Sequence, residues 1–184
     1  MALTQRLGPL ARLFPVPRLD GHRNLIRDAW DLLSVLPGGK IVFSRLVGRM
    51  APYSGSIAAT VNVLRPGYSE VQLQDRRGVR NHLECIHAIA IANLAELAGN
   101  LALAYSMPDD GRFIVSGMEI DYLKKARGTI IAIGEPAVPR TSARAQYDVP
   151  VKVRDASGDR VADVVIHSIV GPKRGPADER SEVN

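Results

Sequence analysis

The chain has 184 residues, of which 46% are hydrophobic and 23% are charged, so it is long enough for one folded domain with a substantial core and is not a disordered chain. Its 24 Lys and Arg outnumber its 19 Asp and Glu, and the resulting net charge of +5 favours anionic partners. The small aromatic content of 5% and the lack of a basic helical stripe argue against nucleic acid as that partner. Cys85 is the single cysteine, which excludes an internal disulfide framework and a cysteine-based zinc site and favours a reducing, cytoplasmic compartment.

Composition changes along the chain predict three parts. We expect an N-terminal extension over residues 1–23, a single domain over 24–171 and a disordered tail over 172–184. The extension is rich in arginine, but its prolines interrupt any targeting helix or signal segment. The tail has no apolar periodicity and therefore adds nothing to a core.

The period of the apolar residues predicts the elements of the domain. Apolar residues first recur at helical spacing over residues 24–50, which we interpret as entry helices that cover an edge of the fold. From Gly55 the period changes to two, which is typical of strands and begins a core that extends to residue 171. The predicted elements are helices over 24–36, 41–50 and 85–104 and strands over 57–63, 70–74, 112–123, 128–135, 143–154 and 160–170.

The helix over residues 85–104 is apolar on almost every side, so it must be enclosed nearly all round. It is about as long as a membrane span, but His87, Asn93 and Glu96 would be costly in lipid. A curved antiparallel sheet is the available wrapping, and the predicted fold class is therefore α+β. Within that sheet Pro150 cannot donate a hydrogen bond to a neighbour, so we expect it at an edge or a bulge.

Sequence motifs for several common chemistries are missing. The nearest match to a serine hydrolase elbow, Gly67–Val71, lacks its second glycine. No phosphate-binding or dinucleotide-binding glycine motif opens a helix, and the histidines lack metal-ligand spacing. We therefore expect no metal and no bound cofactor.

Three polar residues in and before the apolar helix are the candidate catalytic set: Asn81, His87 and Glu96. Each has a structural alternative: Asn81 as a turn residue, His87 as a core histidine, and Glu96 as a hydrogen-bonded buried acid. His87 and Glu96 are nine residues apart, or about 900° of helix, so they leave opposite sides and cannot converge within one chain. They can converge if two helices lie antiparallel about a twofold axis, which predicts two composite sites in a homodimer.

The run NHLECIHAIAIANLAE, with Asn81, His87 and Glu96 at these spacings, and the run IDYLKKARG, residues 120–128, resemble the hotdog-fold thioesterase superfamily. The similarity is greatest to the phenylacetic-acid-type acyl-CoA thioesterase group and its relatives of unknown function, and it covers about residues 40 to 171. It implies a hotdog fold, a curved sheet wrapped around a long central helix, and hydrolysis of an acyl-CoA thioester in a homodimer or a dimer of dimers.

The resemblance also implies roles for individual residues. Glu96 would activate the attacking water or attack as a nucleophile, His87 and the backbone N–H of Ala88 would polarise the thioester oxygen, and Asn81 would position the water or the carboxylate. Coenzyme A enters as part of the substrate, and the candidate ligands of its phosphates are Lys124, Lys125, Arg127, Arg76, Arg77 and Arg80.

Two alternatives to hydrolysis stay open. Ala88 and Ile89 stand where the family commonly has two glycines, and Val115 stands where some relatives carry a polar residue. These departures fit a non-catalytic module that binds acyl-CoA or lipid. A dehydratase or hydratase of acyl thioesters is the third possibility, because such enzymes also use a histidine and a carboxylate.

Overall fold

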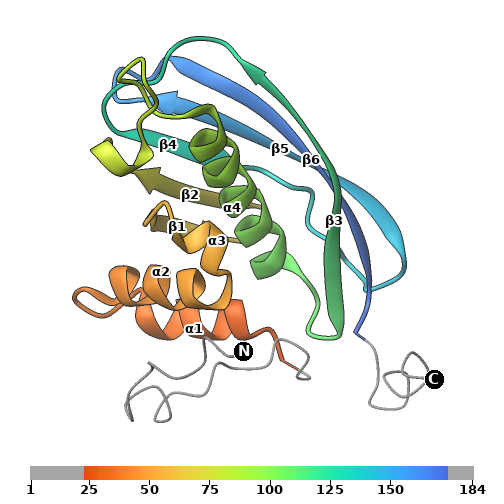
Figure 1. The fold of residues 1–184 in the computed structure, drawn as a ribbon. Coiled ribbons are helices and arrows are strands. Elements are labelled where there is room, and N and C mark those ends of the chain that lie inside the picture. The colour runs from red at the N-terminus through yellow and green to blue at the C-terminus, as the bar shows by residue number, and fades with distance from the viewer. Residues whose placement is uncertain (1–22, 174–184) are drawn as a thin grey trace, which may run out of the picture.

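The structure, a computed structural model, describes residues 23–173 (Figure 1). The expectations for residues 1–22 and 174–184 lie outside this part of the chain. The helices are α1 (Leu25–Leu33), α2 (Gly39–Met50), α3 (Pro52–Gly55), the 3₁₀ turn η2 (Arg77–Val79) and α4 (Ala88–Ser106); the strands are β1 (Thr60–Arg65), β2 (Tyr68–Leu73), β3 (Gly111–Tyr122), β4 (Ile130–Gly134), β5 (Ala145–Asp155) and β6 (Arg160–Pro172).

The six strands form one antiparallel sheet in the order β1-β2-β4-β5-β6-β3. The sheet curves around α4, and α1 and α2 lie together near the β1 end of the sheet (Figure 1). This is the predicted α+β architecture of a curved sheet wrapped around a long central helix. The strand order leaves β1 and β3 as the two edges, so β3 is a 12-residue edge strand.

The central helix α4 is buried along most of its length, as its apolar composition requires. Among the helices of residues 23–173, it alone is long and apolar enough to span a membrane, but most of it lies inside the protein. Gly99 lets the helix approach the sheet, because a Cβ there would lie 2.5 Å from Ile166 Cδ1. Ser69 then fixes this approach by donating from Oγ to the Ala98 carbonyl at 2.7 Å.

The start of α4 differs from the prediction by three residues. Cys85 and Ile86 precede the helix, because Ile86 pairs with Arg80 in a β-bridge and so adopts extended backbone. Cys85 is buried, and its thiol donates to Asn81 Oδ1 at 3.3 Å. The helix therefore begins directly after His87, which becomes its N-cap.

The entry helices cover the β1 edge and the C-terminal half of α4. Trp30 of α1 and Phe43 of α2 pack edge to face with ring centroids 5.1 Å apart. Asn24 caps α1 through Oδ1 and donates from Nδ2 to the carbonyls of Ala104 and Met107 at 2.7 and 3.1 Å. These bonds hold the helical pair against α4, and the edge position predicted for residues 41–50 is confirmed.

Pro150 lies in an interior strand, not at an edge or a bulge of the sheet as expected. Its strand, β5, pairs with β4 on one side and β6 on the other. The Glu135 N–H donates to the Pro150 carbonyl at 3.0 Å, just after β4 ends at Gly134. N–H and C=O of one residue point to the same side of a strand, so the missing donor of Pro150 faces the point where β4 has ended.

Candidate functional site

Three segments of the chain meet at the N-terminus of α4. The Ile86 N–H donates to the Ala126 carbonyl at 2.9 Å, and the His87 N–H donates to the Val79 carbonyl at 2.8 Å. The loops around Val79 and Ala126 therefore flank the helix start on both sides. Both loops carry candidate phosphate ligands, so the fold brings these cations to the positive end of the helix.

His87 is exposed and has its ring in a defined orientation. Its Nδ1 accepts a hydrogen bond from the Ile89 N–H at 3.1 Å, so a neutral ring carries its proton on Nε2 and presents that donor away from the helix. The Ala88 N–H, at the first position of α4, has no hydrogen-bond partner among residues 23–173. Two donors, one from a side chain and one from the backbone, are therefore available at the helix start.

Tyr122 joins the end of β3 to this helix start. Its hydroxyl donates to the Ala88 carbonyl at 3.1 Å, and burial raises the pKa of the Tyr122 hydroxyl, which keeps it a donor. Sequence reasoning missed this residue, although it lies inside the IDYLKKARG run. The contact is between residues 34 positions apart, so only that run could have drawn attention to it.

Asn81 organises the loop that precedes α4. Its Oδ1 accepts from the Leu83 N–H at 2.9 Å and from the Cys85 N–H at 3.4 Å, and the Cys85 thiol lies 3.3 Å away. Asn81 is therefore a turn residue, which is the structural alternative that the sequence left open for it. Its amide Nδ2 has no hydrogen-bond partner among the described residues and is left to bind water or substrate.

Glu96 is half-buried on α4, one turn before Asn100. The Asn100 Nδ2 donates to Glu96 Oε1 at 3.4 Å, while the Asn100 Oδ1 is buried without a hydrogen-bond partner. Nine residues of helix separate Glu96 from His87, a rise of about 13.5 Å and half a turn of rotation. The structure therefore does not bring Glu96 and His87 together within one chain.

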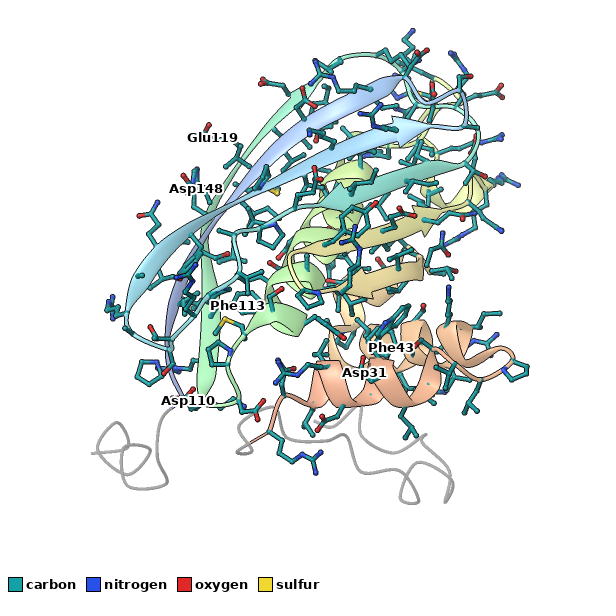
Figure 2. The ribbon with its side chains drawn as sticks, turned by 180° about the vertical axis from the view of Figure 1, so that it is seen from behind. Asp31, Phe43, Asp110, Phe113, Glu119 and Asp148 are labelled. Carbon is teal, nitrogen blue, oxygen red and sulfur yellow. The ribbon has the colours of Figure 1, made fainter. Side chains whose placement is uncertain are left out.

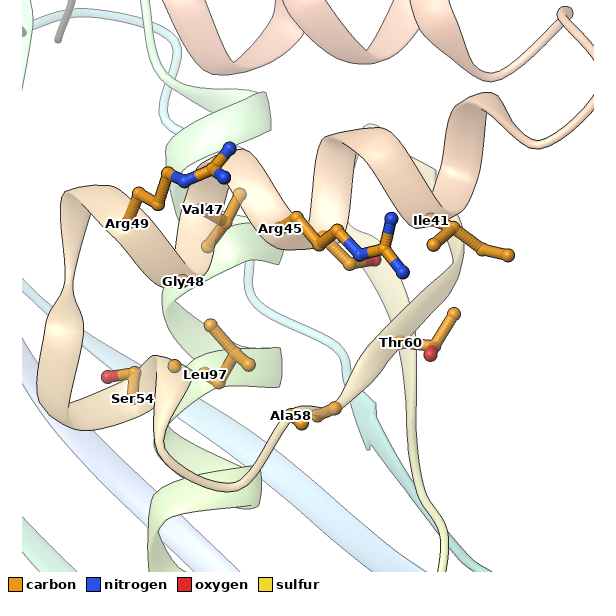
Figure 3. Close-up of a pocket in the computed structure, with 12 residues that line it drawn as sticks. Ile41, Arg45, Val47, Gly48, Arg49, Ser54, Ala58, Thr60 and Leu97 are labelled. Atoms are coloured by element: carbon orange, nitrogen blue, oxygen red, sulfur yellow. The ribbon is translucent and has the colours of Figure 1, made fainter. Parts of the chain in front are cut away.

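A cavity of about 390 Å³ opens beside this side of α4. It extends from Leu97 and Asn100 of α4 to the first residues of β3, Gly111–Phe113, and to α1. A second cavity of about 440 Å³ lies between α2 and α4, and Figure 3 shows Arg45 and Arg49 of α2 and Leu97 of α4 around it. Leu97, the neighbour of Glu96, lines both cavities.

The candidate phosphate ligands fall into two groups. Lys124 lies 2.7 Å from both Asp155 and Asp159, and Arg80 forms a 2.6 Å ion pair with Asp75. The charges of these two cations are therefore balanced within the chain. The remaining four are exposed and form no ion pair with residues 23–173: Arg76, Arg77, Lys125 and Arg127.

Asp75 links the two basic loops. Besides its ion pair with Arg80, it accepts a hydrogen bond from the Gly128 N–H to Oδ2 at 2.8 Å. Its side chain is only 10% exposed, and the Arg80 hydrogen bond, with a contribution from the Gly128 N–H, lowers the pKa of the carboxyl. This carboxylate holds the cationic loops in place beside α4.

A separate polar group lies on the outer face of the sheet, away from α4. His167 on β6 lies between Asp148 Oδ1, at 2.8 Å from Nδ1, and Glu119 Oε1, at 3.4 Å from Nε2. Figure 2 shows Glu119 and Asp148 on this side of the sheet. The hydrogen bond to Asp148 raises the pKa of His167. Within residues 23–173, no group of three His, Cys, Asp or Glu side chains is arranged to hold a metal ion.

The chain is similar to one described protein family and to several solved structures. The family described as a domain of unknown function, DUF4442, matches residues 39–170. A structural-genomics protein, APC5556, is 34% identical, with a TM-score of 0.69 over 80% of this chain and 98% of its own. The protein PA5026 from Pseudomonas aeruginosa, named a probable thioesterase of unknown function, is 22% identical, with a TM-score of 0.64 over 74% of this chain and 97% of its own. A thioesterase family protein from Silicibacter pomeroyi is 15% identical, with a TM-score of 0.61 over 70% of this chain and 96% of its own.

These likenesses show that the chain has a hotdog fold, which it shares with structures named as a probable thioesterase and a thioesterase family protein. None of the curated proteins matches the chain.

Asp75→Asn should lower the free energy of unfolding at neutral pH, because Asn cannot pair with the Arg80 guanidinium. The stabilisation comes from a carboxyl whose pKa is lowered on folding, so it is present above the unfolded pKa of about 3.9 and is lost as pH falls through the folded pKa. The difference between the two proteins should therefore shrink below about pH 4. Denaturant unfolding from pH 7 to pH 2 measures it, with the exposed Asp121→Asn as control. A difference that stays constant with pH would contradict this role for Asp75.

Proposed function

The chain belongs to the family described as a domain of unknown function, DUF4442, and we propose that it hydrolyses an acyl-CoA thioester to a free acid and coenzyme A. Its fold is that of structures named as thioesterases, and the polar residues around α4 supply the groups that this reaction needs. The observation that carries the proposal is the start of α4, where an oriented imidazole and an unpaired backbone N–H lie between two cationic loops. Membership of the phenylacetic-acid-type group stays a prediction from the residue spacings.

The helix start suits the thioester carbonyl. The proton on His87 Nε2 and the N–H of Ala88 would donate to the carbonyl oxygen, on which negative charge develops when a nucleophile adds to the carbonyl carbon. The positive end of the α4 dipole stabilises the same charge. Tyr122, by holding the Ala88 carbonyl, keeps this first turn in place.

Glu96 supplies the base. Its carboxylate would take a proton from water while the oxygen of that water bonds to the carbonyl carbon, and collapse of the tetrahedral intermediate would then break the C–S bond. The leaving thiolate takes up the proton, which leaves the free acid and the thiol of coenzyme A. Asn100 holds one carboxylate oxygen of Glu96, and the free amide of Asn81 would bind the water or the carboxylate.

The site requires two chains, and the β3 edge supports their arrangement. An exposed 12-residue edge strand with Ile114 and Met118 in solvent is suited to pairing with a second copy. In an antiparallel pair of β3 strands, the Tyr122 end of one strand lies beside the Gly111 end of the other. Tyr122 contacts the α4 start, and Gly111 lines the same cavity as Asn100, the hydrogen-bond partner of Glu96. This pairing would bring the His87 of one chain toward the part of the partner's α4 that carries Asn100 and Glu96.

The cationic loops suit the coenzyme A portion of the substrate. Arg76, Arg77, Lys125 and Arg127 are exposed and form no ion pair within residues 23–173, and they lie on the two loops that bond to the α4 start. Phosphates bound there would lie next to the helix end at which the thioester carbonyl is polarised. Arg80 and Lys124, which already have carboxylate partners, would contribute less.

Glu96→Gln should reduce release of free thiol from acyl-CoA by at least about a hundredfold, because the amide cannot accept the proton of water. Affinity for the substrate should stay near that of wild type, since the two side chains have the same size. Thiol release from a panel of short, long and aromatic acyl-CoAs measures activity, and calorimetry measures binding; the exposed Glu135→Gln serves as control. Binding without turnover by the wild type on every substrate would instead establish the acyl-CoA-binding module.

Equal amounts of His87→Ala and Glu96→Gln, each nearly inactive alone, should recover about a quarter of wild-type activity after subunit exchange. Half of the dimers would then be mixed, and each mixed dimer would contain one intact composite site. Mass photometry and thiol release on the same sample measure dimerisation and recovery. No recovery in demonstrably mixed dimers, or a monomeric wild type, would contradict the composite site.

Arg77→Glu together with Arg127→Glu should raise KM for acyl-CoA at least about tenfold with a smaller effect on kcat, because both cations are expected to bind phosphates far from the reacting carbonyl. The matched control is Arg140→Glu with Arg144→Glu, which reverses the same number of exposed charges on the loop before β5. Steady-state kinetics with acyl-CoA, compared with an acyl thioester that lacks phosphates, separates a loss of phosphate binding from a general change in the site. A similar rise in KM for the phosphate-free substrate would argue against phosphate binding.

A further inference from the structure

The turn between α1 and α2 carries an exposed apolar surface that the proposed reaction does not use. We call it the α1–α2 corner. Val35 in the turn is 78% exposed, and Leu32 at the end of α1 is 68% exposed. The large apolar side chains of the corner are Leu32, Val35, Leu36, Ile41 and Val42.

A close backbone contact makes this corner compact. A Cβ on Gly39 would lie 1.8 Å from the Leu33 carbonyl oxygen, so only glycine permits the two helices to join this tightly. The Leu36 and Gly39 N–H groups donate to the Leu33 and Leu36 carbonyls, both at 3.0 Å. The corner projects from the domain at the lower left of Figure 1, and its apolar side chains are therefore carried on a rigid, convex turn.

The charged side chains between residues 32 and 69 are all positive. From residue 32 to residue 69 the chain contains no Asp or Glu, but it contains Lys40, Arg45, Arg49 and Arg65. Arg45 and Arg49 are exposed, form no ion pair with residues 23–173, and follow Ile41 along one side of α2 (Figure 3). The nearest carboxylate in sequence, on Asp31, accepts a hydrogen bond from the Tyr105 hydroxyl at 2.8 Å.

Lys40 donates to the Asn62 carbonyl at 2.7 Å, and neither it, Arg45 nor Arg49 has a carboxylate partner within residues 23–173. Exposed apolar side chains together with such cations match the two properties of an anionic bilayer: an apolar interior within reach of a negative surface. A convex corner also suits a deformable lipid surface better than a protein partner, which needs a shape-complementary patch. We propose that the α1–α2 corner docks this protein on membranes that contain anionic phospholipid. Leu32, Val35, Leu36, Ile41 and Val42 enter the interfacial region, and Lys40, Arg45 and Arg49 bind lipid phosphates.

The corner is placed so that docking leaves the proposed dimer intact. α2 packs on β1, at one edge of the sheet, whereas the proposed pairing uses β3, at the other edge. A dimer would therefore present two corners, and simultaneous docking of both would strengthen binding. Docking involves neither His87 nor Glu96, so its test is independent of hydrolysis.

Sedimentation of the full chain with vesicles tests the proposal directly. The wild type should bind vesicles of phosphatidylcholine mixed with phosphatidylglycerol at least about tenfold more tightly than vesicles of phosphatidylcholine alone, and this preference should weaken as salt is raised. Val35→Asp with Leu36→Asp, and separately Arg45→Glu with Arg49→Glu, should each weaken binding to the anionic vesicles at least about tenfold. Thermal unfolding of both variants verifies that they remain folded.

Matched variants away from the corner serve as controls. Val138→Asp places a carboxylate at another exposed apolar residue, and Arg140→Glu with Arg144→Glu reverses two exposed charges elsewhere; both should bind anionic vesicles like wild type. Three outcomes would overturn the proposal: a wild type that does not bind anionic vesicles, corner variants that bind as wild type does, or control variants that lose as much binding. Corner variants that alter only the oligomeric mass would identify a protein interface instead.

Discussion

Burial of the apolar helix α4 is the constraint on which the rest of this structure depends. Each fully buried Leu or Ile contributes about 1.5–3 kcal/mol, and α4 is apolar on nearly every side, so the protein is stable only if a sheet surrounds the helix. Gly99 and Ser69 bring the helix close to the sheet. At its N-terminus two backbone hydrogen bonds, from Ile86 to Ala126 and from His87 to Val79, fix the helix start between two loops.

This packing also decides where polar chemistry is possible. The sides of α4 that face the sheet have no room for reactive groups, so His87 lies at the exposed end and Glu96 lies half-buried one turn before Asn100, which lines a cavity. A rigid helix keeps these two positions about 13.5 Å apart. For this reason the proposed site combines the end of one helix with the side of another, and the long edge strand β3 is as relevant to it as either residue.

Positive charge is divided between two regions with different surroundings. Beside the α4 start, Asp75 and the pair Asp155 and Asp159 neutralise some of the cations and fix the loops, which leaves the other cations for phosphates. Around the α1–α2 corner no acidic residue occurs in the sequence from 32 to 69, and the cations there lie among exposed apolar side chains. The first arrangement suits a small anionic substrate, and the second suits an extended anionic surface.

The sequence by itself determined the long helices, the six strands and the polar residues in and before α4, because helical and strand periods and the spacing of Asn81, His87 and Glu96 are local properties of the chain. It did not show the short helices α3 and η2 or the exact start of α4. It could not show that Asp75 and the acidic β5–β6 turn neutralise Arg80 and Lys124, that Tyr122 bonds to Ala88, or that Pro150 lies in an interior strand. These features are contacts between separate segments, or depend on where a neighbouring strand ends. Only the tertiary structure decides them, since the physical forces involved act between residues that the sequence does not place side by side.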